Sequence, residues 1–68
     1  MTSDPDIYRV ANILVREYGP EQAPFMAARR ADTLLQLRDL EGLATWKAIL
    51  RAVLELTRTE LGPDERVN

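Results

Sequence analysis

The chain has 68 residues, of which 46% are hydrophobic and 29% charged, and its formal net charge is −2. This length gives room for one small core, and the composition is typical of a folded globular protein rather than of a disordered chain. There is no cysteine and no histidine, which excludes disulfides, thiolate chemistry, the common zinc ligands and the usual general base.

The first segment, TSDPDIYRVANILVREY, has the period of a helix. Ser3 or Asp4 can cap its start by accepting a free backbone N–H. Apolar side chains then recur every three or four residues: Ile7, Val10, Ala11, Leu14 and Tyr18. Gly19 and Pro20 stop the pattern. We therefore expect a helix over about residues 5–18.

The second segment begins at GPEQAPF. Its start could be residue 20 or residue 24, because Pro24 would interrupt a helix already running. Small side chains four residues apart mark its inward face: Ala23, Ala27 and Ala31. The opposite face is polar, and Arg29 and Asp32 have the i, i+3 spacing of an ion pair. We expect a helix from residue 20 or 24 to residue 37.

The third segment begins at Asp39, whose carboxylate can accept the free N–H of Glu41 or Gly42 as an N-cap. One wide apolar face follows: Leu43, Trp46, Leu50, Val53, Leu54, Thr57 and Leu61. Gly62 and Pro63 have the chemistry of a helix C-terminus. This predicts a helix over about residues 40–60 and a frayed tail over residues 62–68.

Together these segments predict an all-α fold, a single three-helix domain over residues 1–68. The side chains expected in its core are Ile7, Val10, Leu14, Tyr18, Ala27, Ala31, Leu34, Leu35, Leu43, Trp46, Leu50 and Val53.

Gly42 and Trp46 are four residues apart and share one face of the third helix. Helical side chains lean toward the N-terminus, so the indole is expected over the turn that contains Gly42. The glycine then provides clearance for the ring or a neighbouring backbone, and Gly42→Ala is expected to destabilise the fold. Trp46 is expected as the main core anchor, with an exposed interface hot spot as the alternative.

Two stretches carry a resemblance: ARRADTLL (Ala28 to Leu35) and DLEGLATWKAIL (Asp39 to Leu50). The chain resembles, over roughly residues 8–58, a family of short, uncharacterised bacterial helical proteins. In that family an R-A-D-x-L stretch precedes a G-D-x-x-G-x-x-x-W-x-x-I stretch. The resemblance implies a small helical domain and supplies no activity. Arg38 stands where the family has glycine, so the C-cap of the second helix departs from the pattern.

A basic stripe on the third helix is the best case for nucleic-acid binding. Lys47, Arg51 and Arg58 lie at i, i+4 and i+11, and Arg29, Arg30 and Arg38 are nearby in sequence. Two helices joined by a short turn also imitate a helix-turn-helix. Against this, Glu55 interrupts the stripe and the net charge is negative. We keep nucleic-acid binding as the alternative function.

The inventory for catalysis is poor, with one serine in a capping position and no glycine-rich phosphate loop. Asp39 and Glu41 are explained by capping without acid–base work. We predict no enzyme, no cofactor, no metal site and no small-molecule substrate. The acidic N-terminus and the lack of an apolar run of roughly 18 residues predict a cytoplasmic protein without a membrane span.

Several apolar residues remain after the core stripes are assigned. Ile49, Ala52 and Leu56 recur at i, i+3 and i+7 beside the face centred on Trp46, and they predict a second narrow seam. A small core gains from burying such a seam against a twin subunit. We therefore expect a protein–protein interaction module, either a homodimer or a chain that docks an unidentified partner helix on the seam, with a monomer as the competing state.

Overall fold

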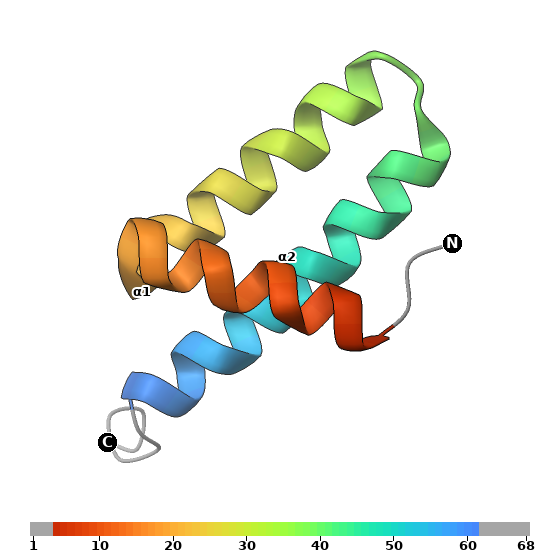
Figure 1. Ribbon diagram of the computed structural model, residues 1–68. Helices are drawn as coiled ribbons and strands as arrows, with labels where there is room; N and C mark the ends of the chain where they lie inside the picture. The colour runs from red at the N-terminus through yellow and green to blue at the C-terminus, as the bar shows by residue number, and fades with distance from the viewer. Residues whose placement is uncertain (1–3, 62–68) are drawn as a thin grey trace.

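The computed structural model describes residues 4–61, and the side chains of residues 4–58. Within that range it is helical and contains no strand, which confirms the all-α prediction. It has two helices, α1 (Asp4–Gln36) and α2 (Leu40–Leu61), and not the three separate helices expected. α1 is kinked at Gly19 (Figure 1). The kink divides it into an N-terminal arm, residues 4–18, and a C-terminal arm, residues 20–36.

Gly19 has φ 87° and ψ 162°, a backbone conformation that is essentially restricted to glycine. A Cβ added there would meet no atom within 4 Å, so the backbone and not packing requires the glycine. The residue before a proline also avoids the helical conformation, and Pro20 directly follows. The predicted break at Gly19 and Pro20 is therefore present as a kink within α1. The C-terminal arm is helical from Pro20 onward, so Pro24 lies inside the helix and the start at residue 20 is the one observed.

The turn between the helices, residues 37–39, is closed by backbone hydrogen bonds. The Arg38 N–H donates to the Leu35 carbonyl at 3.0 Å, and the Asp39 N–H donates to the Leu34 carbonyl at 2.9 Å. This is the Schellman pattern, which needs a left-handed residue at its centre. Arg38 takes that role with φ 61°, where glycine is the usual choice.

Asp39 then starts α2. Its Oδ1 accepts the Gly42 N–H at 3.0 Å, and its carbonyl accepts the Leu43 N–H at 2.9 Å. This confirms the predicted N-cap. One residue therefore ends the first helix with its N–H and begins the second with its carboxylate, which explains how only three residues reverse the chain.

The C-terminal arm and α2 lie side by side and antiparallel, and the N-terminal arm crosses α2 (Figure 1). Small side chains form much of the contact. Residues with no exposed surface are Ala11, Ala23, Ala27 and Val53. Because alanine carries only a methyl group, the helix axes can approach closely at these positions. This confirms the inward alanine face predicted for the second segment.

The core differs in part from the predicted one. Ala27, Ala31 and Val53 are buried as expected. Four predicted core residues pack against the buried cluster from its edge: Ile7, Val10, Leu14 and Trp46. Tyr18 and Leu35, however, are 47% and 53% exposed. Tyr18 ends the N-terminal arm at the kink, and Leu35 is one position beyond the inward stripe that Ala31 and Leu34 continue.

The prediction that Ile49, Ala52 and Leu56 form an exposed interface seam is wrong, because these residues belong to or pack against the core. Ile49 and Ala52 are each only 3% exposed and belong to the core cluster, and Leu56 packs against that cluster. α2 is contacted by both arms of α1, so its buried face turns farther toward Ile49 than a single neighbour would require. A helix that is apolar over so much of its circumference does not by itself indicate which part faces inward.

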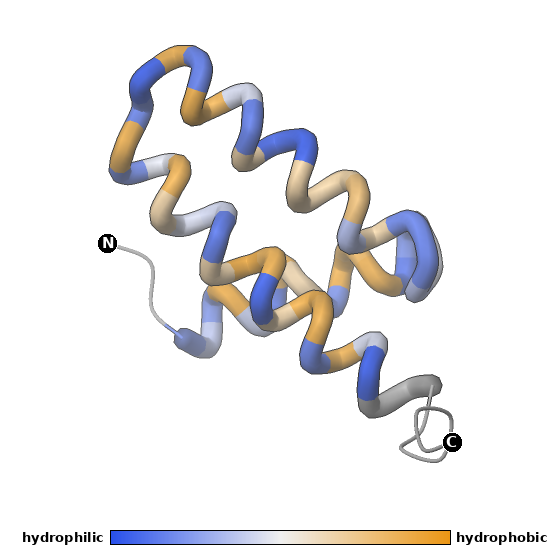
Figure 2. Tube along the Cα trace, turned by 180° about the vertical axis from the view of Figure 1, so that it is seen from behind, coloured by the Kyte–Doolittle hydropathy of each residue, from blue (hydrophilic) through white to orange (hydrophobic). Residues whose placement is uncertain are grey.

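Hydrophobic positions recur along both helices, and some remain at the turn between them (Figure 2). Large apolar side chains with 40–69% of their surface exposed are Tyr8, Ile13, Tyr18, Phe25, Leu35, Leu37, Leu40 and Leu54. Single exposed apolar residues are ordinary. Here they fall mainly on α1 and at the turn, rather than on the α2 seam.

Within the described residues, neither helix combines the length and hydrophobicity that crossing a membrane requires. Three expectations lie outside the described residues: the cap at Ser3, the stop at Gly62 and Pro63, and the frayed tail over residues 62–68.

Candidate interaction groove

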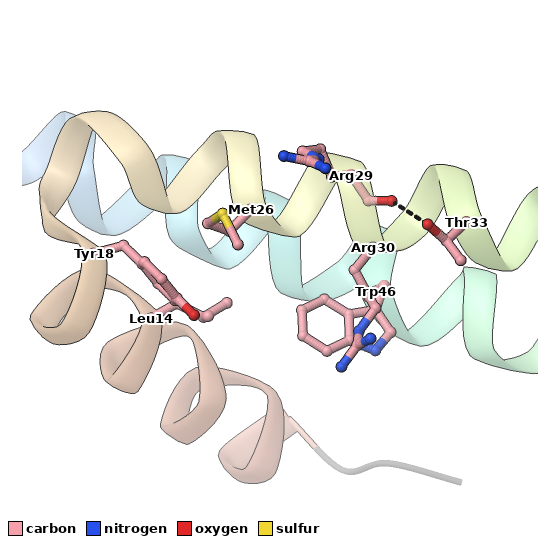
Figure 3. Close-up of a pocket in the computed structure, with 7 residues that line it drawn as sticks. All are labelled: Leu14, Tyr18, Met26, Arg29, Arg30, Thr33 and Trp46. Carbon is pink, nitrogen blue, oxygen red and sulfur yellow. Dashed lines mark hydrogen bonds between the residues drawn. The ribbon is translucent and has the colours of Figure 1, made fainter.

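A groove of about 340 Å³ opens where the two arms of α1 diverge (Figure 3). The N-terminal arm, the C-terminal arm and α2 all contribute to its wall, with the lining residues Leu14, Tyr18, Met26, Arg29, Arg30, Thr33 and Trp46. We call this the Trp46 groove. The kink at Gly19 creates it, because an unbroken α1 would have no angle between its arms.

Trp46 has two roles in this arrangement. It is half-buried and packs against the core cluster, and it also lines the groove. The Arg30 guanidinium carbon lies 5.4 Å from the centroid of its ring, within the range of a cation–π interaction. Both side chains project into the angle between the arms (Figure 3). Trp46 therefore contacts the core cluster and also contributes to the wall of the groove.

The groove combines apolar surface with two positive charges. Within the described side chains, no carboxylate oxygen lies within 4.0 Å of the Arg29 or Arg30 guanidinium. The ion pair predicted between Arg29 and Asp32 is therefore absent from the structure. An occupant with apolar side chains and a carboxylate would match this lining, because arginine binds carboxylates through two parallel hydrogen bonds.

The groove offers little for catalysis. Thr33 is its one aliphatic hydroxyl, and that hydroxyl donates to the Arg29 carbonyl at 3.0 Å. Among the described residues that line the groove, none carries a carboxylate or an imidazole that could serve as a general base. Among the described residues, no group of three acidic side chains is placed to hold a metal ion.

The alternative nucleic-acid face is interrupted by acidic side chains. Lys47, Arg51 and Arg58 are all exposed on α2. Arg51, however, lines a shallow hollow together with Asp4. The Tyr8 hydroxyl donates a hydrogen bond to Glu55, and this bond together with the Glu55 charge raises the pKa of Tyr8. The carboxylates of Asp4 and Glu55 on this part of the surface weaken its attraction for phosphates.

Gly42 leaves room for the Asp39 carboxyl group and not, as was predicted, for the Trp46 ring or a neighbouring helix. The three atoms nearest to a Cβ added at Gly42 all belong to the Asp39 carboxyl group, with Oδ2 at 2.8 Å. Neither Trp46 nor α1 provides the closest contact. The glycine thus leaves room for the capping carboxylate that its own N–H binds.

The sequence points to Trp46 but not to the groove around it. It predicts Tyr18 as a core residue, and it gives Arg30 no role beyond its place near the basic stripe. Arg30 and Trp46 lie on different helices and are 16 residues apart in the sequence. No local spacing in the sequence indicates such a contact.

No protein-family model, curated protein or solved structure matches this chain. The resemblance to short bacterial helical proteins therefore stays a prediction, and functional inference depends on the groove itself.

Proposed function

We propose that this chain is a non-enzymatic protein–protein interaction module that holds a segment of a partner protein in the Trp46 groove. The observation that carries the proposal is the half-buried Trp46 ring with Arg30 over it, in the wall of an open groove. The cytoplasmic location expected from the sequence belongs to the same proposal.

The chemistry of the lining supports protein binding. Tryptophan, tyrosine and arginine are the residue types most enriched among interface hot spots, and methionine adapts to different partners. Trp46, Tyr18, Arg30 and Met26 bring all four types together. Binding a partner residue beside Trp46 would remove the exposed part of the ring from water without disturbing the face packed on the core.

Nucleic-acid binding through Lys47, Arg51 and Arg58 is the competing function. It predicts retention on heparin that falls steeply between low and high salt. Our proposal expects the chain to be retained on heparin only weakly, to the same extent at low and high salt. It expects partner binding at the groove instead.

Site-specific photo-crosslinking tests the groove. A photoreactive amino acid replaces Met26, inside the groove, and in a matched variant Arg16, which is exposed but does not line it. In source cells, position 26 should give a discrete protein adduct that position 16 does not. Adding Arg30→Glu should abolish the adduct while circular dichroism stays unchanged, because the charge facing the partner is reversed.

Two results would overturn the proposed function. One is equal crosslinking from positions 26 and 16, which would mean collision rather than binding. The other is an adduct at position 26 that persists unchanged with Arg30→Glu, because the partner would then not depend on the charged wall of the groove.

A further inference from the structure

The outward face of the C-terminal arm carries a second pattern. Opposite the buried alanines, four exposed residues recur at i, i+4, i+7 and i+11: Phe25, Arg29, Asp32 and Gln36. Phe25 is 65% exposed, more than any other aromatic residue among the described side chains. Residues at this spacing form one stripe along a helix. The stripe has an aromatic ring at one end, an amide at the other and opposite charges in the middle.

The two charges at the centre are available to a neighbour. Arg29 and Asp32 have the spacing of an intrahelical ion pair but do not form one within 4.0 Å. Asp32 accepts one long hydrogen bond from the Gln36 amide, at 3.4 Å. Both side chains are exposed, so neither would lose a strong internal partner on binding elsewhere.

This pattern complements itself when it is reversed. Arg29 and Asp32 lie equally far on either side of the midpoint between residues 30 and 31, and so do Phe25 and Gln36. We propose that two copies of the chain associate through this stripe, antiparallel, with a two-fold axis at that midpoint. Arg29 of each copy then faces Asp32 of the other, and each Phe25 ring packs on the stem of the opposite Gln36.

A two-fold contact repeats each favourable pair, so one complementary pair in the sequence becomes two in the dimer. A parallel arrangement would instead place Arg29 beside Arg29, which is repulsive. Charge therefore selects the antiparallel orientation. The contact area of one helix face is at the small end for stable complexes, so the dimer should need a high protein concentration.

The inference goes beyond the proposed function and also relocates the expected homodimer. Ile49 and Ala52 are buried within the chain and are not free to form it. Of the stripe, Arg29 also lines the Trp46 groove, whereas Phe25, Asp32 and Gln36 do not. The dimer would thus use Arg29 and leave the part of each groove formed by Trp46, Arg30 and Met26 available to partner segments.

A charge-swap series followed by sedimentation equilibrium tests the pairing. Arg29→Asp and Asp32→Arg should each weaken dimerisation by about tenfold or more, since each change places two like-charged pairs across the axis. The double variant Arg29→Asp with Asp32→Arg should restore the affinity to within about threefold of the original, since the pairs are re-formed with reversed sign. Circular dichroism checks that every variant keeps its helicity.

Apolar and covalent variants test the location. Phe25→Ser should weaken the dimer, whereas Leu54→Ser, a matched change at an exposed residue of α2, should not. Because the chain has no cysteine, Phe25→Cys mixed with Gln36→Cys should give a disulfide-linked pair under mild oxidation. Phe25→Cys alone should link poorly to itself.

A strictly monomeric mass at millimolar concentration would overturn the inference. So would a dimer that is unaffected by Phe25→Ser and by the single charge reversals, or one that the double swap does not restore. Crosslinking from position 26 should be the same in Asp32→Arg as in the original chain, so failure of the dimer and failure of the groove give different results.

Discussion

The chain reverses direction twice, at Gly19 and at Arg38, and each reversal depends on a residue with positive φ. At Gly19 the backbone has φ 87° and ψ 162°, where a side chain is strained whatever the residue. At Arg38 φ is 61°, in the left-handed region that other residues enter at a moderate energetic cost. The first reversal requires glycine, whereas the second only prefers it.

This difference determines how each reversal is stabilised. At Gly19 the constraint is the backbone conformation alone, since nothing lies within 4 Å of an added Cβ. Arg38 is held by two backbone hydrogen bonds around it and by the Asp39 cap that follows. A residue with a moderately strained φ is therefore tolerated at Arg38, where hydrogen bonds close the turn, whereas the conformation of Gly19 itself requires glycine.

The largest effect should come from Gly19→Ala. The new side chain forces a choice between strain and a different kink, so we expect a loss of about 1–3 kcal/mol in the free energy of unfolding. A changed kink would also swing the N-terminal arm away from Ala52 and Val53. Urea denaturation followed by far-UV circular dichroism measures the loss.

The matched control is a synthetic chain with D-alanine at position 19. A D-residue favours positive φ, so it should recover most of the stability that L-alanine loses. Equal stability of the L-alanine variant and the original chain would show that Gly19 does not need its observed conformation.

A smaller effect, of opposite sign, should follow from Arg38→Gly. Glycine removes the left-handed strain but adds freedom to the unfolded chain, and the net gain should be roughly 0.5–1 kcal/mol. Arg38→Ala serves as the control, because it removes the guanidinium and keeps the strain. If alanine stabilises as much as glycine, the arginine side chain and not its φ is responsible.

The smallest effect should be that of Gly42→Ala, at the cap that completes the second reversal. Alanine is favoured in helices by about 1 kcal/mol, but its Cβ would displace the Asp39 carboxylate, which lies 2.8 Å away. Loss of an N-cap costs about 1 kcal/mol, so the net change should stay within roughly 0.5 kcal/mol.

A double-mutant cycle makes this prediction sharper. In an Asp39→Ala background no carboxylate remains to be displaced, so Gly42→Ala should then give its full gain of about 1 kcal/mol. Thermal unfolding of the four variants measures the coupling. Identical effects of Gly42→Ala in both backgrounds would mean that the cap and the new methyl group do not compete.

The sequence by itself determined where helices begin and end, because those signals are local. The capping carboxylate of Asp39 and the alanine spacing of the C-terminal arm act within a few residues, and both predictions are confirmed. The sequence left the start of the C-terminal arm open between residues 20 and 24, and the structure has it at Pro20. The left-handed conformation of Arg38 is not predicted by the sequence, since nothing in an arginine favours it; the resemblance indicates only that arginine stands where the family has glycine.

Only the tertiary structure decided which faces meet. α2 offers apolar residues around much of its circumference, and its buried face was determined by two arms contacting it from different directions, which placed Ile49 in the core. Tyr18, at the end of the N-terminal arm, was left exposed beside the kink. The angle of the kink brought Arg30 to Trp46 and opened the groove. Helix formation depends on residues a turn apart, whereas packing depends on the directions of whole helices, and a small change at one glycine alters all of those contacts together.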